Sequence, residues 1–163
     1  MGKFKIIPLS EEEAEKIRAT MKDNFGNMVV EQVATGLGPC RVSLKPFVVG
    51  KDKRLLFSHS TFETSNAFNQ SGPIFINQKA VEEYKTIHQF PPEIKADKEN
   101  FPLTLIGYNH KQQMAFTKLV GEADVDEMIA TIFDENPEIE YLHARNAEAC
   151  CFICKLKGSR KVN

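Results

Sequence analysis

The chain has 163 residues, of which 42% are hydrophobic and 26% are charged. These proportions resemble those of ordinary globular proteins and argue against an intrinsically disordered chain. The 21 basic and 22 acidic residues leave a formal net charge of −1, so no large positive field is present to attract nucleic acid or an anionic membrane. A chain of this length fits one domain, and we expect residues 1–163 to form a single domain.

In the N-terminal half, the residue pattern predicts one helix among short strands. The strands expected here cover 4–9, 28–33, 39–49 and 54–59. Ser10 and Glu13 form a capping box that starts the helix, and the Asn-Phe-Gly-Asn sequence at 24–27 ends it. The last two strands should form a hairpin, with Arg41 on the polar face of the first. The polar segment 60–72 is long for a loop, which indicates a functional or mobile loop.

The C-terminal half is predicted to contain two further helices and two hairpins. Its expected strands cover 73–76, 103–108, 113–120, 139–145 and 149–156. Asn77 can cap a helix that the prolines at 91–92 would end, and Asp124 with Glu127 caps the most regular helix. Residues 157–163 would form a frayed basic tail. Because hairpins outnumber crossovers, the fold class should be α+β, with a mainly antiparallel sheet and two or three packed helices.

Four cysteines are present, namely Cys40, Cys150, Cys151 and Cys154. Their clustering is unlike the disulfide framework of small secreted proteins, so we expect free thiols in a reducing compartment, by default the cytoplasm. No signal-peptide core and no membrane-spanning stretch is expected. Cys151 and Cys154 match Cys-x-x-Cys, but residues three apart on a strand face opposite ways. Buried structural thiols are therefore favoured over a metal site, with a reactive Cys151 as an alternative.

His143 and Arg145 are the pair of residues that most suggests a binding site. Two positions apart on one strand, they share a face with Tyr141. An imidazole beside a guanidinium suits recognition of a carboxylate or phosphate. The competing interpretation is an ordinary solvent-exposed strand face. Arg41 would join the pair if its strand is a near neighbour, whereas no phosphate-binding loop, dinucleotide-binding motif or hydrolase triad is present.

Three segments, in order, resemble a bacterial family catalogued as domain of unknown function 1203. They are Gly-Pro-Cys-Arg at 38–41, Ser-Gly-Pro-Ile-Phe-Ile at 71–76, and His-Ala-Arg-Asn-Ala-Glu-Ala-Cys-Cys-Phe at 143–152. The resemblance covers about residues 38–155 and implies no activity for this chain. It marks the same polar segments as the residue pattern.

The chain departs from that family pattern at several positions. Asn77 stands where a histidine is expected, and Ser43 stands where relatives often have a second cysteine. Both differences argue against a metal site at these positions. The pattern tends to have glycine where Cys150 stands, so Cys151 is the thiol that matches.

Three functions remain open from the sequence. The first is a small-molecule site for an anionic ligand, because converging guanidinium and imidazole groups need a countercharge. Its candidate residues are Arg41, Ser71, Gly72, His143, Arg145, Asn146 and Cys151, with the loop at 60–72 as a lid. The second is a non-enzymatic protein-interaction domain, and the third is a thiol redox or metal-binding module that uses Cys151 and Cys154. The sequence names no reaction, cofactor or oligomeric state.

Overall fold

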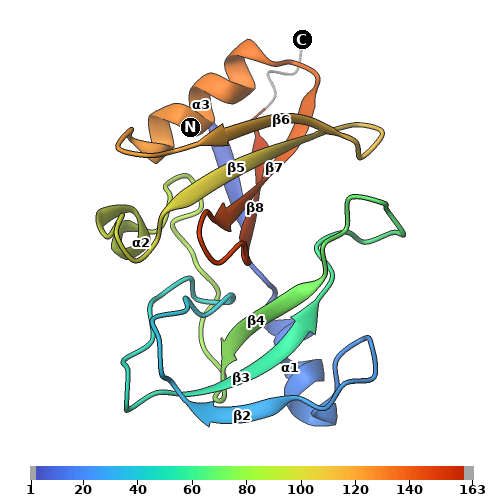
Figure 1. Cartoon of the computed structure of the whole chain (residues 1–163), viewed down its shortest axis with the longest axis vertical. Helices are drawn as coiled ribbons and strands as arrows, with labels where there is room; N and C mark the ends of the chain where they lie inside the picture. Colours follow the sequence, from blue (N-terminus) through green and yellow to red (C-terminus); the bar gives the residue numbers. More distant parts are fainter. Residues whose placement is uncertain (1–2, 160–163) are drawn as a thin grey trace. The chain divides into compact units, whose positions relative to one another are not determined.

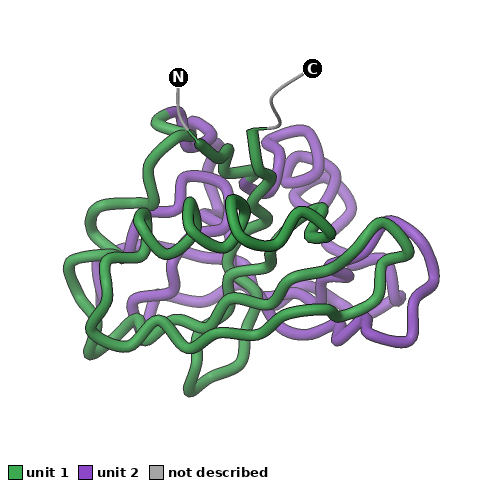
Figure 2. The backbone as a smooth tube through the Cα atoms, turned by 90° about the horizontal axis from the view of Figure 1, so that it is seen from above, with its two compact units in different colours: residues 1–7, 86–163 green, residues 8–85 purple. Residues whose placement is uncertain are grey.

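The computed structural model describes residues 3–159, and within them the chain forms three helices and eight strands (Figure 1). The chain is divided into two compact units (Figure 2). Unit 1 comprises residues 1–7 and 86–163, and unit 2 comprises residues 8–85. Helices together with two antiparallel sheets confirm the predicted α+β class, whereas the expectation of a single domain stays a prediction. No helix in the part of the chain that is described is long and apolar enough to cross a membrane.

Unit 1 contains a five-stranded antiparallel sheet in the order β1-β8-β7-β5-β6. Its strands are β1 (Phe4–Ile7), β5 (Leu103–Asn109), β6 (Met114–Leu119), β7 (Ile139–Asn146) and β8 (Phe152–Gly158). The register confirms both predicted hairpins, β5–β6 and β7–β8. β5 also pairs with β7, so the two hairpins lie side by side in one sheet.

Helix α3 (Val125–Glu135) packs on this sheet, as its spacing of apolar residues predicts. The side chain of Asp124 accepts a hydrogen bond from the Glu127 N–H at 3.0 Å, which confirms the predicted cap. A Cβ atom at Gly158 would lie 2.9 Å from the ring of Phe133, so this glycine allows α3 to approach β8 closely.

Unit 2 contains a three-stranded antiparallel sheet in the order β2-β3-β4, together with one helix. Its elements are α1 (Glu11–Thr20), β2 (Val30–Val33), β3 (Lys53–His59) and β4 (Gly72–Asn77). The Ser10 side chain accepts a hydrogen bond from the Glu13 N–H at 3.1 Å, which confirms the predicted cap of α1. The helix ends at Met21, in a left-handed conformation, earlier than the predicted stop at 24–27. Its buried residues Ala14 and Ile17 belong to the core of the unit.

The predicted strand at 39–49 and its hairpin with β3 are wrong. Residues 41–43 form a turn, and the Cys40 N–H bonds to the Lys45 carbonyl oxygen at 3.0 Å. The main chain at Arg41 has a remote partner, because its N–H bonds to the Phe75 carbonyl oxygen at 3.0 Å. Arg41 is 1% exposed, so it does not lie on a polar strand face. β3 pairs with β2 and β4 and not with residues 39–49.

The predicted helix after Asn77 is also wrong. The Tyr84 N–H bonds to the Val42 carbonyl oxygen at 3.0 Å, so this main-chain donor is used by another segment and not by a helix. The two prolines, expected to end a helix, instead precede and begin the short helix α2 (Pro92–Ala96). Proline suits the first turn of a helix, where its missing N–H has no intrahelical partner to lose.

The predicted tail at 157–163 is wrong where it can be compared with the structure. Lys157 and Gly158 belong to β8, and Ser159 donates its N–H to the Lys3 carbonyl oxygen at 2.9 Å. Residues 160–163 lie outside the described residues. The ordered sheet therefore extends further along the chain than the composition of this segment indicates.

Candidate functional site

Four of the predicted site residues come together in unit 1, on β7 and the turn that follows it. His143, Arg145 and Asn146 lie on β7, and Cys151 directly precedes β8. His143 is 0%, Arg145 5% and Asn146 8% exposed. The alternative interpretation of β7 as a wet strand face is therefore wrong for these residues.

Aromatic rings surround the imidazole of His143. Its centroid lies 4.8 Å from that of Tyr108, 5.3 Å from that of Tyr141 and 5.1 Å from that of Phe152. The Tyr108 and Tyr141 rings stack with centroids 5.4 Å apart, and the Lys155 ammonium lies 4.3 Å from the Tyr141 centroid. Burial raises the pKa of Tyr108, although the nearby Arg145 acts in the opposite direction. The neutral phenol is thus favoured, and this end of the site is a rigid aromatic wall.

Arg145 has few partners for a buried guanidinium. Its Nη1 donates to the Cys150 carbonyl oxygen at 2.9 Å, while its buried Nε has no hydrogen-bond partner. Within residues 3–159 it forms no ion pair with a carboxylate. Burial lowers the pKa of Arg145, and Tyr108 and Cys151 partly oppose this shift. A charge in this setting needs a countercharge or further acceptors.

Arg54 of unit 2 shows how a buried guanidinium in this protein is satisfied without a carboxylate. Its Nε and Nη2 donate to Gln32 Oε1 at 3.0 and 2.9 Å, and its Nη1 donates to the Gly36 carbonyl oxygen at 3.1 Å. Its Cζ lies 3.7 Å from the centroid of the Phe75 ring. Arg54 therefore has four hydrogen bonds to neutral acceptors, the fourth from Nη2 to Thr35 Oγ1 at 3.2 Å, and a cation–π contact, in contrast to Arg145.

The side chain of Asn146 holds the β7–β8 turn. Its Oδ1 accepts the N–H groups of Glu148 and Ala149, both at 2.9 Å. The main chain of Asn146 bonds to both cysteines that follow. Its N–H donates to the Cys151 carbonyl oxygen at 3.0 Å, and its carbonyl oxygen accepts the Cys150 N–H at 2.9 Å. Asn146 therefore positions the Cys150 carbonyl group that Arg145 contacts.

Cys150 has a φ of 65°, in the left-handed region that favours glycine. This backbone conformation gives a physical reason for the glycine expected at this position from the family resemblance. Cys150 is exposed, Cys151 is partly buried and Cys154 is buried, and all are free thiols, as is Cys40. Across residues 3–159, no group of three or more His, Cys, Asp or Glu side chains could hold a metal ion.

The other predicted site residues, Arg41, Ser71 and Gly72, belong to unit 2. The Arg41 guanidinium donates to the Pro39 carbonyl oxygen within its own turn. Ser71 is exposed and donates to Asn69 Oδ1 at 3.4 Å, and Gly72 begins β4. That Arg41, Ser71 and Gly72 join the residues on β7 stays a prediction.

His59, at the end of β3, is a titratable residue that the sequence did not place with Arg41. Burial lowers the pKa of His59 to about 4, and the charge of Arg41 contributes to this shift. The two residues are 18 positions apart and Arg41 lies in a turn, so no local pattern could have indicated their proximity.

The predicted loop at 60–72 is irregular over residues 60–71, and hydrogen bonds from its side chains to one another and to its main chain organise it. Asn69 Nδ2 donates to Ser60 Oγ at 2.7 Å, and Ser60 Oγ donates to the Phe62 carbonyl oxygen at 3.0 Å. Asn69 Oδ1 also accepts from the Thr61 N–H at 3.4 Å. These bonds give the loop a defined shape, while its function as a lid stays a prediction.

Comparison with known proteins identifies the class to which this fold and site belong. The structure is that of an α+β protein with two antiparallel sheets, carrying a buried His-x-Arg-Asn segment on its five-stranded sheet. Residues 38–157 match the family described as "Protein of unknown function (DUF1203)", and the chain belongs to this family. Searches of the curated proteins and of the solved structures found no match. The family membership confirms the resemblance inferred from the three sequence segments.

Proposed function

We propose that this protein binds a small anionic ligand through Arg145 of unit 1. The observation that supports this function best is the buried guanidinium with one main-chain partner, an unpaired Nε and no carboxylate among the described residues. An anion would supply the missing charge and would accept a hydrogen bond from Nε. Arg54, with four hydrogen bonds to neutral acceptors, indicates that this protein can supply partners to a buried arginine without a ligand.

The neighbours of Arg145 favour a compact ligand with a polar end. Asn146 fixes the turn that holds the Cys150 carbonyl group, and this group orients the guanidinium. The aromatic wall of Tyr108, Tyr141 and Phe152 limits access of water, which strengthens a charge-assisted hydrogen bond. Cys151 is partly buried beside the turn, so a thiol lies close to the proposed ligand.

We also propose that the protein is cytoplasmic, because a reducing compartment keeps four cysteines as free thiols. The alternatives of a protein-interaction domain and of a thiol redox or metal-binding module stay predictions. Cys154 is 0% exposed, which weakens a redox or metal role that would need both thiols to be accessible.

The test uses inorganic phosphate and succinate as probes, with sodium chloride at matched ionic strength as the reference. In the wild-type chain each effective probe should raise the unfolding midpoint, because binding to the folded state adds stability of about 2.7 kcal/mol at one hundred times Kd. Amide signals of residues 146–151 should shift in the same titration. Arg145→Met should remove the dependence on the probe, whereas Lys111→Met, at an exposed turn, should retain it. Equal probe-dependent stabilisation of the Arg145→Met variant would refute the proposed function.

A further inference from the structure

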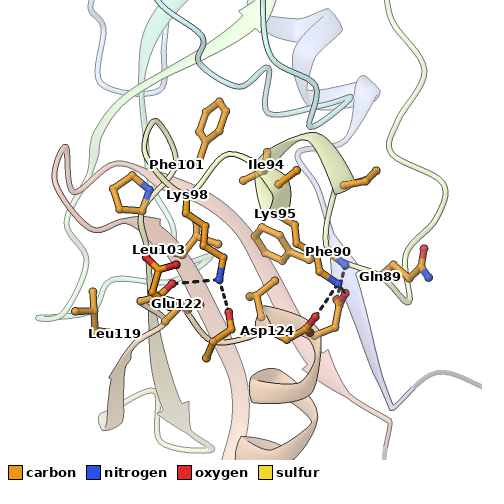
Figure 3. Close-up of a pocket in the computed structure, with 18 residues that line it drawn as sticks. Gln89, Phe90, Ile94, Lys95, Lys98, Phe101, Leu103, Leu119, Glu122 and Asp124 are labelled. Atoms are coloured by element: carbon orange, nitrogen blue, oxygen red, sulfur yellow. Dashed lines mark hydrogen bonds and ion pairs between the residues drawn. The ribbon is translucent and has the colours of Figure 1, made fainter.

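A second candidate site lies in unit 1, between α2 and the segment that enters α3. A pocket of about 720 Å³ opens there, and Figure 3 shows the side chains that line it. Ligand pockets in proteins have volumes of roughly 300–1,000 Å³ and combine a mainly apolar lining with a few polar groups. Arg145, His143 and Cys151 do not line this pocket, so it is separate from the site proposed above.

The deeper lining of the pocket is apolar and buried. Phe90 is 1%, Ile94 0%, Leu103 5% and Val125 2% exposed. These residues come from α2 and its approach, from the start of β5 and from the start of α3. These side chains form a packed floor, and the apolar surface open to a ligand comes from exposed lining residues such as Leu119, which is 64% exposed, and Pro92.

Hydrogen bonds and ion pairs hold the two walls of the pocket in place. Asp126 Oδ1 accepts the Phe90 N–H at 2.7 Å, and Asp126 Oδ2 accepts from Lys95 Nζ at 2.7 Å. Lys95 Nζ also lies 3.1 Å from Asp124 Oδ2. These side-chain hydrogen bonds raise the pKa of Lys95, whose charge is thus matched by two carboxylates. The pocket is pre-formed, and Lys95 is already bonded to two carboxylates of its wall (Figure 3).

Lys98 is the second cationic group of the pocket, and its partners differ from those of Lys95. Its Nζ donates to the carbonyl oxygens of Ala123 at 2.7 Å and Gly121 at 3.4 Å, on the opposite wall (Figure 3). It forms no ion pair with a carboxylate among residues 3–159. An ammonium group has three donors, so one remains for a ligand oxygen. Glu122 is exposed at the rim, where water screens its charge.

We propose that this pocket binds a small amphipathic carboxylate, with its apolar body against the accessible lining residues Leu119 and Pro92 and its carboxylate on Lys98. The apolar lining favours the body, and the ammonium without an ion pair favours an anionic end over a neutral or cationic one. The pre-formed walls reduce the conformational cost of binding. The ligand class therefore differs from the compact anion assigned to Arg145.

The test is an amide NMR titration of the full chain at pH 7 with 2-naphthoate and its neutral analogue 2-naphthamide. The probes have almost the same shape and differ in charge. Naphthoate should shift the amide signals of residues 95–98 and 120–126. It should also bind about tenfold more tightly than naphthamide, because one hydrogen bond between charged groups has about this effect on Kd. Lys98→Met should abolish this preference, whereas Lys111→Met should preserve it. Ala123→Trp, at an exposed lining position, should weaken the binding of both probes, because the larger side chain fills the pocket.

Several results would overturn the proposal. These are equal affinities of the two probes for the wild-type chain, a retained naphthoate preference in folded Lys98→Met, or saturable shifts confined to residues outside 89–126. Absence of saturable shifts up to the solubility of the probes would also overturn it. Circular dichroism and the unfolding midpoint establish that each variant is folded. Shifts at 146–151 would instead report on the site at Arg145, so the two proposals can fail separately.

Discussion

Replacement of Arg145 by methionine should stabilise the protein while it removes anion binding. The guanidinium is 5% exposed and donates one hydrogen bond, from Nη1 to the Cys150 carbonyl oxygen. Burial of an ionised group costs several kcal/mol, and a hydrogen bond to a charged group returns about 1.5–3 kcal/mol. Methionine has a similar length and no charge, and water can solvate the carbonyl group of the exposed Cys150. We therefore expect the free energy of unfolding to rise by roughly 1–3 kcal/mol.

Urea unfolding followed by circular dichroism measures this change. With a slope of about 2 kcal/mol per molar urea, the midpoint of Arg145→Met should rise by about 1 M. Arg54→Met is the matched control, because it removes a guanidinium with four hydrogen bonds and leaves the Gln32 and Gly36 oxygens without their donors. That variant should lose about 2 kcal/mol. A folded Arg145→Met variant that is destabilised as much as Arg54→Met would refute the reasoning, because it would give Arg145 a structural role.

Three further predictions concern His59 and the cysteines. Because the pKa of His59 is about 4 in the folded state and about 6.5 in the unfolded state, the unfolded state takes up a proton first as pH falls. Stability should therefore drop by up to about 3 kcal/mol between pH 6.5 and 4, and urea titrations of His59→Gln should show a smaller drop; an identical pH profile would contradict this. Cys150→Gly should keep the free energy of unfolding or raise it by up to about 1 kcal/mol, whereas Cys150→Val should lower it by about 1 kcal/mol or more, since φ is 65°. In the native protein a thiol reagent should modify Cys150 first and Cys151 more slowly, and should reach Cys40 and Cys154 only on unfolding; rapid labelling of all four, counted by mass spectrometry, would contradict the burial.

The elements that could be predicted from the sequence are those specified by neighbouring residues. The caps at Ser10 and Asp124 act within three residues of themselves, and both appear in the structure as expected. The hairpins at 103–120 and 139–156 follow from alternation on two strands joined by a short turn. In each case the pattern and its hydrogen-bond partners lie in one continuous segment.

The two elements that were predicted wrongly have different main-chain partners from those expected. At 39–49 the apolar alternation is real, but the Cys40 N–H bonds to Lys45 and the Leu44 N–H bonds to Cys40, so the segment turns back on itself and does not extend as a strand. After β4, the Tyr84 N–H bonds to Val42, and no helix forms. At the second place a tertiary hydrogen bond overrides local helix propensity, and at the first a turn interrupts the alternation that indicated a strand.

The candidate site could be predicted in its position but not in its physical character. His143 and Arg145 attract attention because polar residues interrupt an otherwise apolar strand. Their burial and the missing partners of Arg145 depend on the packing of other elements, so they become evident only in the structure. The pocket at Lys98 could not be predicted from the sequence. Its walls are joined by the hydrogen bond between Lys95 and Asp126, which are 31 residues apart.

The most direct test of the anion site at Arg145 is a crystal of the wild-type protein soaked in sodium selenate, with data collected at the selenium edge. The selenium atom would locate a bound tetrahedral anion without ambiguity. We predict an anomalous peak beside Arg145, from a selenate whose nearest oxygen atom lies about 3 Å from Arg145 Nε. An ordered Arg145 with no peak beside it, or with Nε bonded to a group of the protein itself, would contradict the account.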